Sequence, residues 1–218
     1  MVNFCSGCGV SLRGTAVQHS PGCGASSSNG FASPVRLGEV PGATIKLDLG
    51  CGKNKKPGFI GVDVMKFDGV DVVHNLGDPS WAWPWSDNSV EEVHASHFIE
   101  HLKPGERQHF ANELFRVLKP GATATIITPH WNSPRAYGDL THAWPPVCEW
   151  WYLYLSKAWR EQNAPHNEGY MCDFPQPTIG YSPNPGYCAG RNQEYVQEAV
   201  TKWRGGADDM SAVLVKPK

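Results

Sequence analysis

The sequence lacks any apolar run long enough to cross a membrane as a helix. Such a helix needs about 20 mostly apolar residues, and hydrophobic residues, 40% of this 218-residue chain, are dispersed along it. The N-terminus also lacks the positively charged and apolar regions of a secretory signal peptide. We therefore expect no membrane segment and a cytoplasmic location.

An even set of cysteines and an excess of charge of one sign are also missing. The chain has seven cysteines, an odd number that argues against a secreted disulfide framework. Its formal net charge is −2, which gives no electrostatic case for nonspecific binding to nucleic acid or to a membrane. Length and composition suit one α/β domain with a buried core and a small appendage.

The appendage is predicted at residues 1–24, where Cys-x2-Cys-x10-His-x3-Cys is formed by Cys5, Cys8, His19 and Cys23. Three thiolates and one imidazole complete a tetrahedral structural site for Zn²⁺. So short a segment cannot build its own core, and bound zinc would stabilise it. We predict a zinc-ribbon- or knuckle-like segment, and the alternative is a tail with reduced cysteines. It is also the one route to a nucleic-acid partner, which the net charge does not favour.

The rest of the chain divides into a linker and a main domain. Residues 25–42 are rich in Ala, Ser, Gly and Pro and have no periodicity, which predicts a flexible linker. Residues 43–218 form the predicted main domain.

Two apolar runs near the start of the main domain each end at a carboxylate. Asp48 precedes Gly50, Cys51 and Gly52, and Asp63 ends the second run. This pattern predicts two parallel strands that bring both carboxylates to the carboxyl edge of a sheet, where ligands bind in open α/β folds. The glycines would let the backbone approach a ligand closely. Asp63 is placed to accept hydrogen bonds from ribose hydroxyls.

A dinucleotide site is disfavoured at this loop. Its fingerprint has a third glycine, for which this chain has Lys55, and an acid about 20 residues after the first glycine. Asp63 follows Gly50 by only 13 residues.

Further elements follow in order along the main domain. We expect strands over residues 70–76, 90–98 and 122–128, with a helix over 104–118 before a Lys-Pro-Gly terminator. Later helices are expected over 147–159 and 193–203, and a closing strand over 211–215.

The segments LDLGCG, GVD, WPWSDNSV, ASHFIEHL and RVLKPG stand in the order seen in class I S-adenosylmethionine-dependent methyltransferases. The chain resembles this family closely over residues 43–130 and loosely beyond. The resemblance implies an α/β fold, a Rossmann-like and mostly parallel sheet flanked by helices, and methyl transfer from S-adenosylmethionine. The alternative is an inactive, methyltransferase-like and zinc-containing scaffold that recruits a partner.

The resemblance also implies cofactor-binding residues. They are Asp48, Gly50, Cys51 and Gly52 at the methionine moiety, Asp63 at the ribose, Asn75 or Asp78 at the adenine, and Ser96 and His97 facing cofactor or substrate. Many relatives carry an acid where Asn75 stands, so the choice between Asn75 and Asp78 stays open. The interval after Gly52 is short and contains Pro57, so the long helix usual there is expected to shrink to a turn or short helix.

One motif is set aside. His97, Glu100 and His101 match H-x-x-E-H, a zinc-protease signature. The motif begins where a strand passes into a helix, and similar stretches occur without metal in the family that the chain resembles. We therefore do not predict a metallopeptidase.

Residues 131–190 follow the last strand of the resemblance and are predicted to form a substrate lid or insertion. His130, Asp139 and His142 are the candidate catalytic residues, because imidazole can act as a general base near neutral pH. His130 is the first choice because it directly follows a strand edge. The alternative is that these residues only hold a loop together.

Two missing motifs argue against direct methylation of DNA bases. DNA amino-methyltransferases carry Asp/Asn-Pro-Pro-aromatic after the fourth strand, where this chain has Ser96, His97, Phe98 and Ile99. The Pro-Cys nucleophile of cytosine-C5 enzymes is also missing. A small molecule, a modified nucleotide or a protein side chain remains as the acceptor, with transfer by in-line displacement that depends on alignment.

Overall fold

The computed structural model describes residues 3–4, 11–12 and 44–218. Strands β1 (Asn3–Phe4) and β2 (Ser11–Leu12) form a small antiparallel pair. They belong to a unit of residues 1–35, distinct from the unit of residues 36–218. The predicted zinc ligands Cys5, Cys8, His19 and Cys23 and the predicted linker lie outside the described residues.

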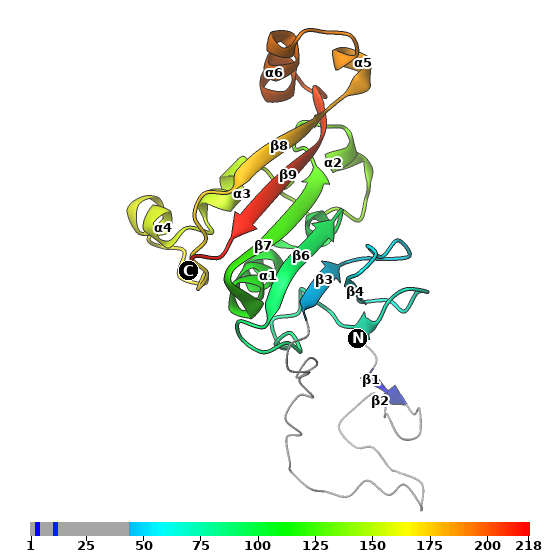
Figure 1. Cartoon of the computed structure of the whole chain (residues 1–218), viewed down its shortest axis with the longest axis vertical. Helices are drawn as coiled ribbons and strands as arrows, with labels where there is room; N and C mark the ends of the chain where they lie inside the picture. The colour runs from blue at the N-terminus through cyan, green and yellow to red at the C-terminus, as the bar shows by residue number, and fades with distance from the viewer. Residues whose placement is uncertain (1–2, 5–10, 13–43) are drawn as a thin grey trace, which may run out of the picture. The chain divides into compact units, whose positions relative to one another are not determined.

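One seven-stranded sheet organises residues 44–218, in the order β5-β4-β3-β6-β7-β9-β8 (Figure 1). Five neighbouring strands, from β5 to β7, are parallel, β9 is antiparallel to β7, and β8 is antiparallel to β9. The expected mostly parallel α/β sheet is thus confirmed. The strands are β3 (Ile45–Leu49), β4 (Ile60–Asp63), β5 (Val72–Val73), β6 (Val90–Ser96), β7 (Leu118–Pro129), β8 (Thr178–Pro183) and β9 (Ala207–Val215).

Most helices of the described domain are short. They are the 3-10 helix η1 (Ile99–His101), α1 (Pro104–Val117), α2 (Arg135–Gly138), α3 (Glu149–Leu153), α4 (Lys157–Asn163), α5 (Pro185–Cys188) and α6 (Gln193–Lys202). Among the described residues, none is both long and apolar enough to cross a membrane.

Helix α1 packs its apolar face on the sheet. Pro104 stands at its first position, and the side chain of Glu106 accepts a hydrogen bond from the amide of Lys103 at 2.7 Å, which satisfies an amide at the helix start. Phe110, Leu114 and Val117 are fully buried on its inner side. The helix ends within one residue of the prediction, and β7 follows at once.

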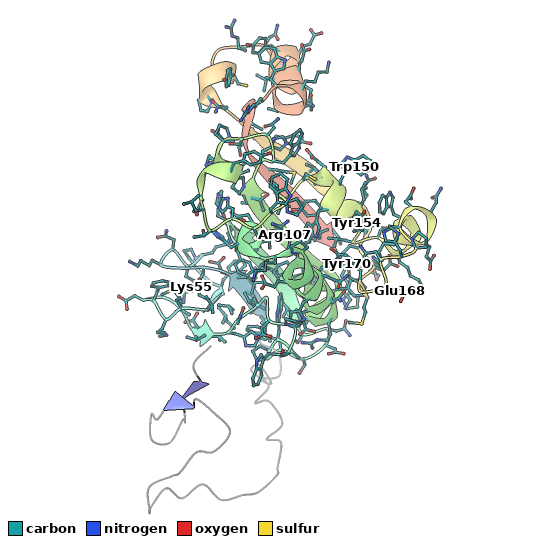
Figure 2. The ribbon with its side chains drawn as sticks, turned by 180° about the vertical axis from the view of Figure 1, so that it is seen from behind. Lys55, Arg107, Trp150, Tyr154, Glu168 and Tyr170 are labelled. Carbon is teal, nitrogen blue, oxygen red and sulfur yellow. The ribbon has the colours of Figure 1, made fainter. Side chains whose placement is uncertain are left out.

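The two faces of the sheet differ in cover. In β7, Ala124 and Ile126 are fully buried, whereas Thr123 and Thr125 between them are partly exposed. Figure 1 shows β6, β7 and β9 with no described helix lying across them, and the view from behind shows α1 on the other face (Figure 2). The apolar half of each alternating strand therefore faces α1, and the polar half faces away from it.

The expected reduction between β3 and β4 is confirmed, because residues 50–59 form turns and no helix. The strand expected over residues 70–76 covers only Val72–Val73. It shortens because the side chain of Asn75 accepts the amide of Gly77 at 3.2 Å, which turns the chain out of the sheet edge.

Two predictions after β7 are corrected. The single helix expected over residues 147–159 is two helices, because Ser156 begins a new one by accepting the amide of Trp159 on its hydroxyl at 3.4 Å. The predicted lid at 131–190 includes β8, which pairs with β9, so residues 178–183 belong to the sheet. β8 is an edge strand containing Gly180 and Pro183, which masks its strand pattern.

Candidate functional site

The glycine loop after β3 has a backbone that demands glycine. Gly50 has φ +67°, and a Cβ there would lie 2.4 Å from Cδ2 of Phe98. The amides of Gly50 and Cys51 both donate to the carbonyl of Val62, at 2.8 and 3.2 Å. Gly52 has φ +52° and nothing within 4 Å of its Cβ position, so the loop leaves room beside it.

Asp63 connects the ends of β3 and β4. Its Oδ2 accepts the amide of Gly52 at 2.9 Å, and its Oδ1 accepts the amide of Met65 at 2.9 Å. Each carboxylate oxygen can accept a further hydrogen bond. The side chain is only partly buried, so that capacity is open to a ligand.

Asp48 is buried, and both its oxygens are occupied. Oδ1 lies 2.7 Å from Nδ1 of His94, and Oδ2 accepts the amide of Lys56 at 2.7 Å. Asp48 therefore holds the glycine loop in place from the end of β3, through the amide of Lys56. Its partner His94 was not predicted, because the two meet only through the register of β3 against β6.

Cys51 is a neutral thiol. Burial, together with the carboxylates of Asp48 and Asp63, raises the pKa of Cys51 to about 11. The thiol donates weakly to the carbonyl of Gly52 at 3.7 Å. It shapes the loop and is not a nucleophile at neutral pH.

The two candidates for the adenine position both hold turns after β5. Asn75 accepts the amide of Gly77, and Asp78 accepts the amide of Ser80 at 2.9 Å. Asn75 is exposed and Asp78 partly so. The choice between them stays open.

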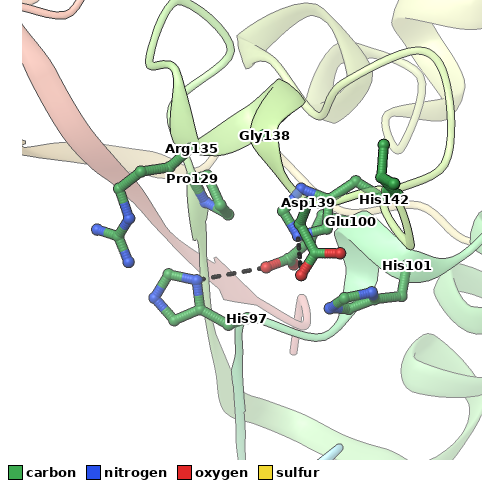
Figure 3. Close-up of a pocket in the computed structure, with 9 residues that line it drawn as sticks. His97, Glu100, His101, Pro129, Arg135, Gly138, Asp139 and His142 are labelled. Atoms are coloured by element: carbon green, nitrogen blue, oxygen red, sulfur yellow. Dashed lines mark ion pairs between the residues drawn. The ribbon is translucent and has the colours of Figure 1, made fainter.

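A pocket of about 600 Å³ lies at the carboxyl edge of β6 and β7 (Figure 3). Ser96 ends β6, and His97 follows with φ +53°, its amide donating to the carbonyl of Ile127 at 2.8 Å. The pocket brings together three of the predicted site residues, His97, Asp139 and His142, and also Glu100 and His101 of the motif that was set aside. It is lined by His97, Glu100, His101, Pro129, Arg135, Gly138, Asp139, Leu140 and His142.

The neighbouring Glu100 carboxylate raises the pKa of His97, with burial opposing that shift. Their closest atoms, Nδ1 and Oε1, lie 3.3 Å apart, and Nε2 of His97 is 3.8 Å from Oδ2 of Asp209. The pocket thus combines imidazoles with carboxylates, one of which is buried.

His130 lies elsewhere. It is 1% exposed, with Nδ1 at 2.6 Å from Oδ1 of Asn132 and Nε2 at 3.2 Å from Oε1 of Glu149. Asn132 Oδ1 and Glu149 Oε1 both accept hydrogen bonds. Both bonds therefore form together only when the His130 ring carries a proton on each nitrogen, and a ring with two protons cannot accept a further proton. His130 is not among the residues that line the pocket, and its role as the base, ahead of His142, stays a prediction.

Glu149 was not predicted from the sequence as a partner of His130. Burial tends to raise the pKa of Glu149, but hydrogen bonds from His130, a backbone amide and the hydroxyl of Tyr181 outweigh burial and lower it to about 2. These hydrogen bonds fasten the start of α3 to β8.

Arg107 of α1 organises the side of the pocket. It is 3% exposed and donates to four backbone carbonyls, those of Ile99 and Glu100 in η1 and of Ala143 and Pro145 in the loop after α2. It also borders a second pocket, of about 340 Å³, with aromatic walls that include Trp150, Tyr154 and Tyr170 (Figure 2).

Comparison with solved structures identifies the fold. An S-adenosylmethionine-dependent methyltransferase from Archaeoglobus fulgidus is similar over 80% of this chain and 87% of its own, at 21% identity and a TM-score of 0.57. At that identity the likeness shows the fold, which is the Rossmann-like fold of that protein.

Two weaker likenesses have TM-scores below 0.5. A putative sarcosine dimethylglycine methyltransferase from Galdieria sulphuraria is 13% identical, with coverage of 80% and 78% and a TM-score of 0.47. Phosphoethanolamine N-methyltransferase 2 from Haemonchus contortus is 15% identical with a TM-score of 0.42, and this chain spans about half, 49%, of its length. No protein-family model and no curated protein matches the sequence.

Proposed function

We propose that this protein is an S-adenosylmethionine-dependent methyltransferase. The observation that carries the proposal is the pairing of Asp63 with the amide of Gly52 at 2.9 Å, which joins a carboxylate and a glycine loop at the carboxyl edge of β3 and β4. The shared fold with the Archaeoglobus fulgidus methyltransferase, at a TM-score of 0.57, supports this reading.

The residues present fit the cofactor. The loop has an uncrowded glycine at Gly52, where a side chain would take up the space beside the backbone. Asp63 keeps acceptor capacity for the two hydroxyls of a ribose. Asp48, held by His94 and Lys56, keeps the loop in shape for the methionine moiety.

When bound, the cofactor supplies an electrophilic methyl group on a sulfonium. The chain's own part is then to align the acceptor with that methyl and to exclude water. The pocket lined by His97, Asp139 and His142 lies at the same edge of the sheet, and we propose that it receives the acceptor. The acceptor class stays as predicted, a small molecule, a modified nucleotide or a protein side chain.

The test is calorimetric titration of the full chain with S-adenosylmethionine. Asp63→Ala removes a charge-assisted hydrogen-bond acceptor, so we expect a loss of about 1.5–3 kcal/mol, roughly a 10- to 150-fold rise in Kd. Asp68→Ala is the matched control, because Asp68 is an exposed carboxylate shortly after β4.

Three outcomes are informative. No heat with the parental protein favours the inactive scaffold and overturns the proposal. An Asp63→Ala protein that is folded by circular dichroism and keeps the parental Kd overturns the ribose assignment. A rise in Kd in Asp63→Ala but not in Asp68→Ala supports both cofactor binding and the assignment of Asp63 to the ribose.

A further inference from the structure

The pocket at the end of β6 contains a buried carboxylate without hydrogen bonds. Glu100 is 4% exposed, and within residues 44–218 neither of its side-chain oxygens has a hydrogen-bond partner. Nδ1 of His97 approaches Oε1 to 3.3 Å as an ion pair, without hydrogen-bond geometry. Burying a carboxylate in this state is costly unless another group compensates its charge.

Two imidazoles approach the same carboxylate. Glu100, His101 and His142 each offer a ligand atom, and these atoms all lie within 4.8 Å of one another. The rings of His101 and His142 meet edge to face with centroids 4.8 Å apart. Figure 3 shows Glu100 between His97 on one side and the His101–His142 pair on the other.

Hydrogen bonds indicate which ring nitrogen carries the proton in His101 and in His142. The hydroxyl of Thr141 donates to Oδ1 of Asp139 at 2.6 Å, so it accepts from Nδ1 of His101 at 3.0 Å. Nδ1 of His142 donates to the carbonyl of Ala136 at 3.2 Å. Both rings therefore keep the proton on Nδ1, and Nε2 of each has a lone pair that no hydrogen bond among the described residues uses, as in metal-bound histidines oriented by a second hydrogen bond. Nε2 of His142 lies 3.9 Å from Oδ2 of Asp139, beyond hydrogen-bond distance.

The backbone holds the three side chains together before any ligand arrives. The amide of Ala143, next to His142, donates to the carbonyl of Glu100 at 2.8 Å. The guanidinium of Arg107 spans the same two segments through the carbonyls of Glu100 and Ala143, at 3.4 and 3.1 Å. The ligands come from η1 and the loop after α2, and both segments are fastened to α1.

We propose that Glu100, His101 and His142 bind a divalent first-row transition-metal ion in this pocket. Two imidazoles and one carboxylate form a donor set that suits such ions and leaves coordination positions open. Those positions would face the pocket of about 600 Å³, where oxygen atoms of a second ligand can reach them. A bound cation would also compensate the buried charge of Glu100.

This site differs from the peptidase motif set aside above. That motif would pair His97 with His101, whereas His97 lies toward Glu100 and Asp209. The second imidazole comes instead from His142, in the loop after α2. Glu100, His101 and His142 come from two separate segments, so no linear sequence motif contains all three proposed ligands.

The experiment titrates the full chain, freed of metal, with Mn²⁺ followed by electron paramagnetic resonance. Mn²⁺ prefers oxygen and nitrogen donors over thiolates, so the N-terminal cysteines do not compete. We expect about one Mn²⁺ per chain, with affinity falling roughly 10- to 100-fold or more in Glu100→Gln, His101→Ala and His142→Ala. No methyl donor is present, so the result is independent of the proposed function.

His166→Ala is the matched control, because it removes an exposed imidazole outside the pocket. His101 is itself exposed, so His101→Ala keeps the test valid even where the buried Glu100→Gln protein fails to fold. Loss of affinity in His101→Ala and His142→Ala with His166→Ala unchanged supports the site. A parental protein that binds no Mn²⁺, or folded His101→Ala and His142→Ala proteins that bind it as the parent does, overturns it.

Discussion

Several ionisable side chains lie buried in this fold. Asp48, Glu100, Arg107 and His130 are all nearly inaccessible to water. Asp48, Arg107 and His130 are each held by hydrogen bonds with other segments, so removing one partner leaves a buried polar group uncompensated. By contrast, neither side-chain oxygen of Glu100 has a hydrogen-bond partner within residues 44–218.

The Glu149–His130 pair predicts a dependence of stability on pH. Its hydrogen bonds hold the pKa of Glu149 near 2, below its ordinary value of 4.5. A lowered carboxyl pKa stabilises the fold above the ordinary value, and that stability is lost as the pH falls from about 4.5 towards 2. Glu149 is one-third exposed, so solvent screening limits the effect, and we expect Glu149→Gln to cost about 1–2 kcal/mol at pH 7.

Chemical denaturation of both proteins at pH 7, 5 and 3 measures this difference. The difference in unfolding free energy should be full at pH 7 and shrink at pH 3, because the carboxyl is then largely protonated in the unfolded chain while Glu149 stays mostly ionised in the fold. Glu168→Gln, at an exposed carboxyl, should change neither value. A difference between parent and Glu149→Gln that stays constant from pH 7 to pH 3 would contradict the assignment.

Only some of these residues can be predicted from the amino-acid sequence. The proximity of Gly50, Gly52 and Asp63 was predictable because all three lie in one short segment, and the structure brings them together, while their binding roles stay a prediction. The pairings of Asp48 with His94 and of His130 with Glu149 join separate segments, so they depend on register and packing that no local pattern encodes.

Among the elements, α1 has the widest influence on the pocket. It carries Arg107, whose four hydrogen bonds connect η1 with the loop at residues 143–145. The position of both segments therefore depends on one side chain of a helix that packs on the sheet.

Arg107→Met should loosen those segments while keeping much of the side-chain volume. Loss of hydrogen bonds from a charged donor predicts a destabilisation of about 2–4 kcal/mol. Amide hydrogen exchange should quicken at Ala143, whose N–H donates to Glu100, more than in the strands of the core. Arg191→Met, at an exposed arginine, is the control. Unchanged exchange at Ala143 in the Arg107→Met protein would show that the loop is held by other contacts.

Elements with strong local signals were predicted well. The strands β3, β4 and β6 and the helices α1 and α6 agree with their apolar periodicity and terminators. The break between α3 and α4 and the edge strand β8 were missed, because a serine cap inside an aromatic stretch and a strand containing Gly and Pro give weak local signals.

At the scale of the whole chain, the cysteine-rich N-terminus stays a prediction. We expect about one zinc per chain at Cys5, Cys8, His19 and Cys23 after metal-replete purification. Elemental analysis measures it, and Cys5→Ser/Cys8→Ser should lose this zinc while Cys148→Ser keeps it. His142→Ala separates any zinc in the pocket from zinc at the thiols. Less than about a tenth of an equivalent in the parent, or full zinc in the double variant, would reject the site.

The unequal cover of the sheet has a consequence for how this sequence can vary. Ala124 and Ile126 in β7 and Ala212 and Leu214 in β9 face the helix side and are fully buried, so each has little freedom to change volume. Thr123, Thr125 and Ser211 look the other way and are only partly exposed to water. Tolerance to substitution should therefore alternate residue by residue along β7 and β9. Positions that face away from α1 should accept substitutions, and positions that face α1 should not.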